Sequence, residues 1–114
     1  MEIILHLSTA MICFLGSCHP ALVGVNTPVG TYTMTHYKAE KFGGDVLVFY
    51  EDDKHIYSLH RLNEHPTQDR LNAMISRNPE DRKGLTDGGI NVAPNIYEKL
   101  TICCSKYKLV IKQD

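Results

Sequence analysis

Two apolar segments joined by a short charged turn constrain the fold of this chain most strongly. Residues 45–50 and 55–62 are rich in β-branched and aromatic side chains, and residues 51–54 between them read Glu-Asp-Asp-Lys. This pattern is typical of two strands connected by a hairpin turn, because such side chains pack well on a pleated sheet. The chain is therefore expected to build a sheet around this pair.

The first half of the sequence contains further strand-like runs. Gly-Ser at residues 16–17 and a Pro- and Gly-containing segment at residues 26–30 are turn signals that separate these runs. No internal repeat is visible. The strands predicted before the hairpin cover residues 2–7, 11–15, 21–25 and 31–37.

The second half changes to a helical pattern. Residues 66–75 predict a short helix in which Leu71, Met74 and Ile75 share one apolar face, because they are spaced by three and four residues. Asn-Pro at residues 78–79 stops this helix.

A second helix and a last strand complete the predicted elements. Residues 94–103 predict a helix in which Pro94 suits the first turn and in which Ile96, Leu100 and Cys103 face the core. Residues 108–112 predict the strand. The elements together predict a β-rich α+β fold with two short helices late in the chain.

Length and charge limit the organisation and the partners. The 114 residues fit a single domain over residues 1–114. Twelve Lys and Arg against 13 Asp and Glu give a net charge of −1, which offers no electrostatic reason to expect nucleic acid or an anionic membrane as a partner. No apolar run approaches the roughly 20 residues that span a bilayer. Residues 15–18 look a little like a lipoprotein processing site, but the chain starts with Met-Glu rather than with positive charge, so we favour strands there.

Four cysteines leave the disulfide pattern open. Cys13 and Cys18 would bridge a hairpin, or Cys18 would instead reach Cys103 or Cys104. Four cysteines allow three pairings, and the sequence does not choose among them. A zinc site made of all four thiolates would lack the paired CxxC spacing of such sites, so we predict no metal and no cofactor.

A glycine-rich segment is the best candidate for chemistry. Residues 86–92 read Thr-Asp-Gly-Gly-Ile-Asn-Val, which predicts a tight turn with accessible backbone N–H groups, followed by a strand. Such N–H groups, together with a histidine base, make half of an acyl-transfer site. His60 lies near the end of a predicted strand and is the candidate base, although one histidine among six is more often an ordinary surface or core residue.

Several segments form a more specific pattern in combination than any of them does alone. Residues 27–32 read Thr-Pro-Val-Gly-Thr-Tyr, Leu-His follows a strand at residues 59–60, and residues 86–92 hold the glycine turn. A helix and a strand at residues 97–100 and 109–111 close the chain. In this order the segments resemble the L,D-transpeptidase (YkuD-type) catalytic domain of bacterial cell-wall enzymes. The resemblance covers nearly the whole chain and implies a β-sandwich of mixed sheets, with the helix at residues 66–75 filling a histidine-to-turn gap longer than in compact members.

The resemblance implies acyl transfer on peptidoglycan stem peptides. In that family a cysteine attacks the bond between meso-diaminopimelate and D-alanine, D-alanine leaves, and an amine of a neighbouring stem resolves the thioester into a 3→3 cross-link. For this sequence it implies that His60 is the base, that Gly88 belongs to the oxyanion turn and that Thr86 supports the histidine. The substrate-binding positions expected here are Arg61, Arg82 and Asn91.

One position departs from the family pattern. Gly89 stands where the nucleophilic cysteine belongs, and glycine supplies no thiolate. The chain is therefore expected to be inactive in the family reaction, either as a Cys→Gly form of an enzyme, which we favour, or as a natural pseudoenzyme. The alternatives are a dead module that binds cell-wall peptide or a partner protein, and a secreted effector that acts on peptidoglycan. The resemblance implies a periplasmic or cell-envelope location and leaves the oligomeric state open.

Overall fold

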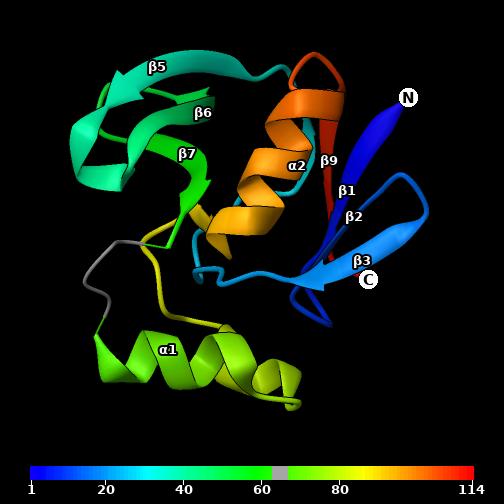
Figure 1. Ribbon diagram of the computed structural model, residues 1–114, viewed down its shortest axis with the longest axis vertical. Coiled ribbons are helices and arrows are strands. Elements are labelled where there is room, and N and C mark those ends of the chain that lie inside the picture. Colours follow the sequence, from blue (N-terminus) through cyan, green and yellow to red (C-terminus); the bar gives the residue numbers. More distant parts are fainter. Residues whose placement is uncertain (63–66) are drawn as a thin grey trace.

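Two mixed β-sheets form the framework of the protein in a computed structural model that describes residues 1–62 and 67–114 (Figure 1). The first sheet has the order β3-β2-β1-β9-β4, and the second has the order β5-β6-β7-β8. The first contains β1 (Glu2–His6), β2 (Met11–Phe14), β3 (Ser17–Pro20), β4 (Gly30–Tyr32) and β9 (Lys108–Lys112). The second contains β5 (Thr35–Ala39), β6 (Gly44–Glu51), β7 (Ile56–Arg61) and β8 (Ile90–Val92).

Two α-helices and two 3-10 turns connect these strands. They are α1 (Gln68–Ile75), α2 (Pro94–Cys104), η1 (Glu40–Phe42) and η2 (Pro79–Arg82). The predicted β-rich α+β class, with mixed sheets and two helices late in the chain, is confirmed. Among the described helices, none is long and apolar enough to cross a membrane.

The predicted hairpin is formed by β6 and β7. These strands pair antiparallel from Glu51 and Ile56 at the turn to Leu47 and Leu59. On its other side β6 pairs with β5, and β7 pairs in parallel with β8. Both strands therefore have a neighbour on each side, which agrees with their apolar sequences.

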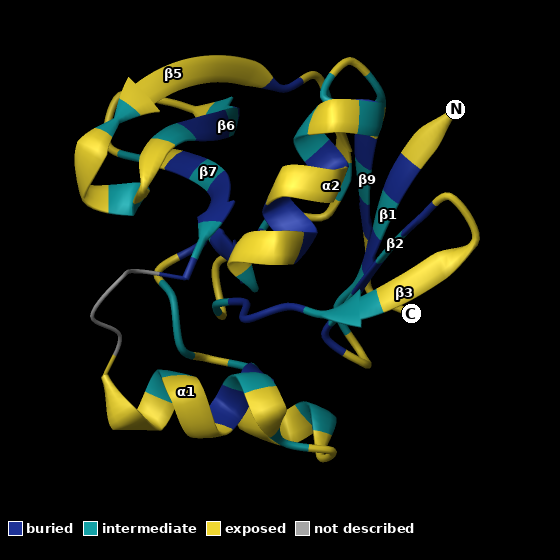
Figure 2. Ribbon diagram, viewed as in Figure 1, coloured by how far each residue is buried: buried dark blue, intermediate teal, exposed yellow. Residues whose placement is uncertain are grey.

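The helix α2 lies between the two sheets and joins their apolar faces (Figure 1). Its buried residues, where the ribbon is dark blue in Figure 2, are Ile96, Tyr97, Leu100 and Cys104. They belong to one apolar cluster with side chains from both sheets. The predicted core positions Ile96 and Leu100 are confirmed, whereas Cys103 is only partly buried and Cys104 points into the core instead.

The helix α1 packs against the sheets less closely than α2 does (Figure 1). Of the predicted apolar face, Met74 is partly buried and packs inward, but Leu71 is 41% exposed and Ile75 is 80% exposed. The buried residue of α1 is Ala73, which packs with Leu22 and Leu62 in a small second cluster. The contact expected of Leu71, Met74 and Ile75 is therefore made by Ala73 together with Met74 alone.

The predicted strand over residues 31–37 is divided between the two sheets. Tyr32 pairs with Leu109 in the first sheet, whereas Thr35 pairs with Val48 in the second. The chain crosses between the sheets at residues 33–34. The alternation of residue types runs through this crossing, so the sequence showed no break there.

The predicted strand over residues 21–25 is also wrong. Leu22 exchanges two backbone hydrogen bonds with Asn91, but the next residue, Val23, donates to the Arg82 carbonyl and accepts from Leu85. Because the partner segment changes from one residue to the next, isolated bridges form in place of a strand.

Both disulfide bonds join cysteines that are close in sequence. Cys13 and Cys18 are directly opposite each other on β2 and β3 and form one bond. Cys103 and Cys104 form the other at the end of α2. Of the pairings that the sequence left open, the hairpin bridge is the one observed.

A carboxylate near the start of β6 connects the second sheet to α2. Asp45 accepts a hydrogen bond from the Tyr97 hydroxyl at 3.0 Å and pairs with Arg61 at 2.9 Å and with His36 at 3.0 Å. The Arg61 guanidinium also lies 4.3 Å from the centroid of the Tyr97 ring. Burial raises the pKa of Asp45, but the hydrogen bonds and the neighbouring positive charge outweigh burial and hold that pKa below its ordinary value.

Replacing Asp45 with Asn should lower the free energy of unfolding by about 1–2 kcal/mol at pH 7, because hydrogen bonds to a charged group are lost. The folded-state pKa lies below the unfolded value of about 3.9, so this stabilisation is present above about pH 4 and is lost as the pH falls through the folded-state pKa. Urea unfolding of Asp45→Asn and the parent between pH 7 and pH 2 would show the difference shrinking. Asp53→Asn in the exposed turn is the control, and an equal effect at both positions would contradict the prediction.

Candidate functional site

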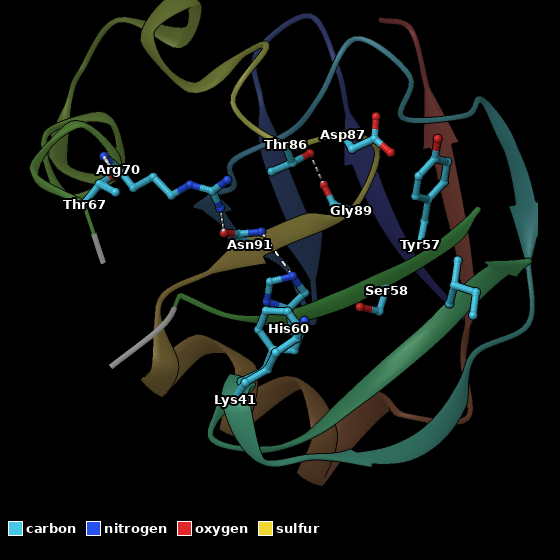
Figure 3. Close-up of a pocket in the computed structure, with 12 residues that line it drawn as sticks. Lys41, Tyr57, Ser58, His60, Thr67, Arg70, Thr86, Asp87, Gly89 and Asn91 are labelled. Atoms are coloured by element: carbon cyan, nitrogen blue, oxygen red, sulfur yellow. Dashed lines mark hydrogen bonds between the residues drawn. The ribbon is translucent and has the colours of Figure 1, made fainter. Parts of the chain in front are cut away.

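A pocket of about 530 Å³ opens where β7, β8, η1 and the start of α1 meet. His60, Thr86, Gly89 and Asn91, all singled out from the sequence, line it. Figure 3 shows these residues converging from separate segments. Because β7 and β8 pair in parallel with His60 opposite Asn91, the register of the sheet brings the histidine beside the glycine turn.

Both ring nitrogens of His60 have a defined partner. Nδ1 lies 2.9 Å from the Arg61 carbonyl oxygen, which can only accept, so we assign the proton to Nδ1. Nε2 is then the acceptor and faces the Asn91 side-chain amide, Nδ2, at 3.4 Å. The Phe42 ring packs on the imidazole with centroids 4.0 Å apart. The lone pair of Nε2 therefore faces the Asn91 amide, which lies two residues after Gly89.

The environment of His60 favours the neutral imidazole. Burial lowers its pKa most, the hydrogen bond to Arg61 raises it, and the positive charges of Arg70 and Lys41 lower it further. The net result is a pKa below the ordinary histidine value. At neutral pH the ring can therefore act as a proton acceptor.

The backbone at Gly89 fits a short side chain that points at His60. A Cβ added to Gly89 would lie 3.8 Å from Nε2 of His60 and 3.1 Å from the Ser58 carbonyl oxygen. The second contact requires a shift of a few tenths of an ångström. The φ of Gly89 is outside the left-handed region, so its backbone does not require glycine.

Gly88, in contrast, is required by packing. A Cβ at Gly88 would overlap the ring of Tyr57, which is a buried residue of β7. The Gly88 carbonyl accepts a hydrogen bond at 3.1 Å from the buried hydroxyl of Thr27. Residues 27–32 and 86–92, paired in the sequence analysis only by pattern, are thus in direct contact.

A hydrogen bond from Thr86 closes the glycine turn. The Thr86 hydroxyl donates to the Gly89 carbonyl at 2.6 Å. The expected support of His60 by Thr86 is not seen, because the ring nitrogens of His60 bond Arg61 and Asn91. Asn91 holds the imidazole where Thr86 was expected to do so.

Backbone donors are available at the turn. In the described part of the chain, none of the loop hydrogen bonds is donated by the N–H of Gly88 or Gly89. Such groups can stabilise a developing oxyanion. Within the same described residues, no group of three or more His, Cys, Asp or Glu side chains is arranged to hold a metal.

Two arginines expected to bind substrate lie outside the pocket. Arg82 is 4% exposed, and its guanidinium donates to the carbonyl oxygens of Thr9, Ala10 and Ser76. Arg61 is paired with Asp45, as described above. Both cations are engaged in holding segments of the fold together, so the geometry of the pocket does not support the substrate-binding role expected for them.

Two other cations line the pocket, and neither was assigned a site role from the sequence. Arg70 extends from α1 and donates to the Asn91 side-chain oxygen at 2.6 Å and to the Leu85 carbonyl at 2.9 Å (Figure 3). Lys41 reaches the same space from η1. Neither lies in a motif segment. The only sequence signal for Arg70 was its place in the helix that lengthens the gap between His60 and the turn.

Substitution by alanine should affect the free energy of unfolding differently at Gly88 and at Gly89. Gly88→Ala should lower the free energy of unfolding by about 2 kcal/mol or more, because its methyl group overlaps the Tyr57 ring. Gly89→Ala should change it by less than about 1 kcal/mol, because the smaller entropy of the unfolded alanine chain offsets the tight contact with Ser58. Urea unfolding of both variants tests this. The double variant Gly88→Ala/Tyr57→Ala should lose less than the sum of its single changes, and strict additivity would count against the overlap.

His60 should titrate below the value of about 6.5 found in unfolded chains. Between the two pKa values the unfolded chain binds more protons, so the free energy of unfolding should fall as the pH falls from about 6.5 toward the folded-state pKa. NMR of the imidazole carbons in native and urea-unfolded protein measures both pKa values, and His60→Gln should lack this part of the pH dependence. A native pKa at or above the unfolded one would rule out the assigned environment.

No family model and no curated protein matches the sequence. Among solved structures the chain is similar to an L,D-transpeptidase from Mycobacterium smegmatis, with a TM-score of 0.59 and 12% identity over 97% of this chain and 58% of that one. The same values relate it to the L,D-transpeptidase LdtMt1 in complex with imipenem. For the Mycobacterium tuberculosis L,D-transpeptidase 1 the TM-score is 0.50, with 13% identity over 96% and 57% of the two chains. The chain thus spans less than two thirds of each of these structures, and it has an L,D-transpeptidase-like fold.

Proposed function

We propose that residues 1–114 are an L,D-transpeptidase-type domain that binds peptidoglycan stem peptides and lacks turnover because Gly89 has no thiol. The observation that carries this proposal is the distance of 3.8 Å between the Cβ position of residue 89 and Nε2 of His60. A neutral histidine beside a nucleophile position on a glycine turn is the arrangement that covalent acyl transfer requires. The L,D-transpeptidase-like fold supports the same interpretation.

A cysteine at position 89 would complete the acyl-transfer site. His60 would take the thiol proton at Nε2, the sulfur would attack the carbonyl carbon before D-alanine, and His60 would return the proton to the departing amine. The N–H groups of Gly88 and residue 89 would stabilise the oxyanion. An amine of a second stem would then open the thioester to form a 3→3 cross-link, or water would open it, leaving D-alanine release as the net reaction.

A second function, peptide binding without chemistry, is supported by the state of the pocket. The pocket keeps its volume of about 530 Å³ and its buried histidine although the nucleophile position is glycine. The packing of His60 on Phe42 and its hydrogen bond to Asn91 do not depend on a thiol. The present chain would therefore present the same walls to a stem peptide as an active enzyme would.

Both functions have the same consequence for location. Peptidoglycan lies outside the inner membrane, so a protein that binds its stem peptides works in the periplasm or the cell envelope. We propose that location for this chain.

Replacing Gly89 with Cys should create acyl-transfer activity. The variant should form a covalent adduct with imipenem, seen as a mass increase, and should release D-alanine from a soluble stem tetrapeptide. The matched control Gly89→Cys/His60→Gln keeps the thiol and lacks the base, so its rate should be at least about a hundredfold lower.

Two measurements test the two candidate functions. Titration of the unmodified chain with the same tetrapeptide, followed by calorimetry, should show saturable binding under both proposals. A folded Gly89→Cys protein that forms no adduct and releases no D-alanine would contradict the transpeptidase proposal. A flat titration of the unmodified chain would contradict both proposals.

A further inference from the structure

The charged side chains of the pocket lie at separate ends. Figure 3 shows Arg70 on one side and Asp87 on the other, with His60 and Gly89 between them. Lys41 also lies on the side away from Asp87. The pocket thus has a cationic end and an anionic end in place of internal ion pairs.

The charge of Arg70 is not neutralised by the residues it contacts. Its two hydrogen bonds go to the side-chain oxygen of Asn91 and the backbone carbonyl of Leu85, which are both neutral acceptors. A guanidinium has five N–H donors, so further donors remain for a ligand. Among the described residues, no carboxylate forms an ion pair with Arg70 or with Lys41.

Lys41 adds a second positive charge beside the histidine. It is exposed on η1, and its ammonium lies 5.0 Å from the centroid of the Phe42 ring. That ring packs directly on His60. An anion that enters this pocket would therefore meet Lys41 and Arg70 in the walls around the candidate base.

A singly charged carboxylate suits this pocket better than a doubly charged anion does. The planar guanidinium can bind both oxygens of one carboxylate, and an ammonium adds a point charge. A dianion such as phosphate would also interact unfavourably with Asp87 across the same pocket.

We propose that Arg70 and Lys41 form a carboxylate subsite that makes the pocket select peptides with a free carboxylate over the same peptides in amidated form. The inference rests on the proposed function for the nature of the ligand and goes beyond it by naming the residues that recognise its charge. Both residues lie in connecting segments, η1 and α1, outside the glycine turn and outside residues 27–32. Specificity in this chain is thereby assigned to connections rather than to the motif segments.

Binding of a carboxylate at the subsite should change the pKa of His60. The positive charges of Arg70 and Lys41 disfavour protonation of His60, as described above. A bound carboxylate offsets those charges, so the pKa of His60 rises when the subsite is filled. An uncharged amide of the same shape has no such effect.

The first experiment uses two ligands: a soluble stem tetrapeptide whose carboxylates are free, and the same peptide with its carboxylates amidated. Calorimetry measures the binding of each to the unmodified chain and to single variants. The free acid should bind about tenfold more tightly, and Arg70→Gln should abolish this preference. Lys41→Gln should reduce it, and because Lys41 is exposed, this variant reports on the subsite even if Arg70→Gln folds poorly. Arg77→Gln is the matched control, because Arg77 is exposed just after α1 and outside the pocket, and it should keep the full preference.

A second measurement separates this proposal from the proposed function. Acetate, but not acetamide, should raise the pKa of His60 seen by NMR in the unmodified chain and in Arg77→Gln, and should do so less in Lys41→Gln. If acetate raises the pKa of His60 in this way but the tetrapeptide does not bind, the subsite is supported and stem-peptide binding is not. Equal binding of the acid and amidated peptides, tighter binding of inorganic phosphate than of acetate, or equal effects of acetate and acetamide on His60 would overturn the subsite.

Discussion

The contact between residues 22–27 and the glycine turn is the constraint on which the rest of the site depends. Gly24 lies so close to Thr86 that any Cβ at position 24 would overlap the Thr86 carbonyl, and its N–H donates to the Thr27 hydroxyl at 2.9 Å. That hydroxyl in turn donates to the Gly88 carbonyl, so the turn is fixed on the side away from the pocket. A turn fixed in this way holds residue 89 at a defined distance from the histidine, as the proposed acyl transfer would require.

A short hydrogen-bonded chain across the pocket defines the state of the candidate base. Arg70 bonds the oxygen of the Asn91 amide, which fixes the amide nitrogen toward His60, and His60 bonds the Arg61 carbonyl with its other nitrogen. A buried amide held by a cation on one side and an imidazole on the other has a single favourable orientation. The imidazole is therefore held in one orientation although position 89 carries no side chain.

Much of the sheet framework could be predicted, because alternation of residue types and turn residues are local signals. The proximity of His60 to the glycine turn could also be predicted, since the order of the motif segments resembles that of a known family. The roles of the arginines could not be predicted, because they depend on contacts between distant segments. Arg82 bonds Ala10, which is 72 residues away, and Arg70 reaches Asn91 only because α1 folds back over the pocket. The burial of α1 likewise depends on which face meets the sheets, and the apolar residues of its sequence did not show that.

The parallel pairing of β1 with β9 has a consequence for how the chain reaches this structure. Ile4 lies opposite Val110, so the centre of the first sheet joins the first strand of the chain to the last. Closing so long a loop costs entropy that no local contact repays, and folds built on such pairings form slowly. During synthesis on a ribosome, the hairpin of β1 and β2 emerges early. It cannot pair with β9 until β9 has also left the ribosome. The second sheet, whose β5, β6 and β7 are consecutive along the chain, can assemble before that, so we expect the histidine strand to be in place before the sheet that closes the fold.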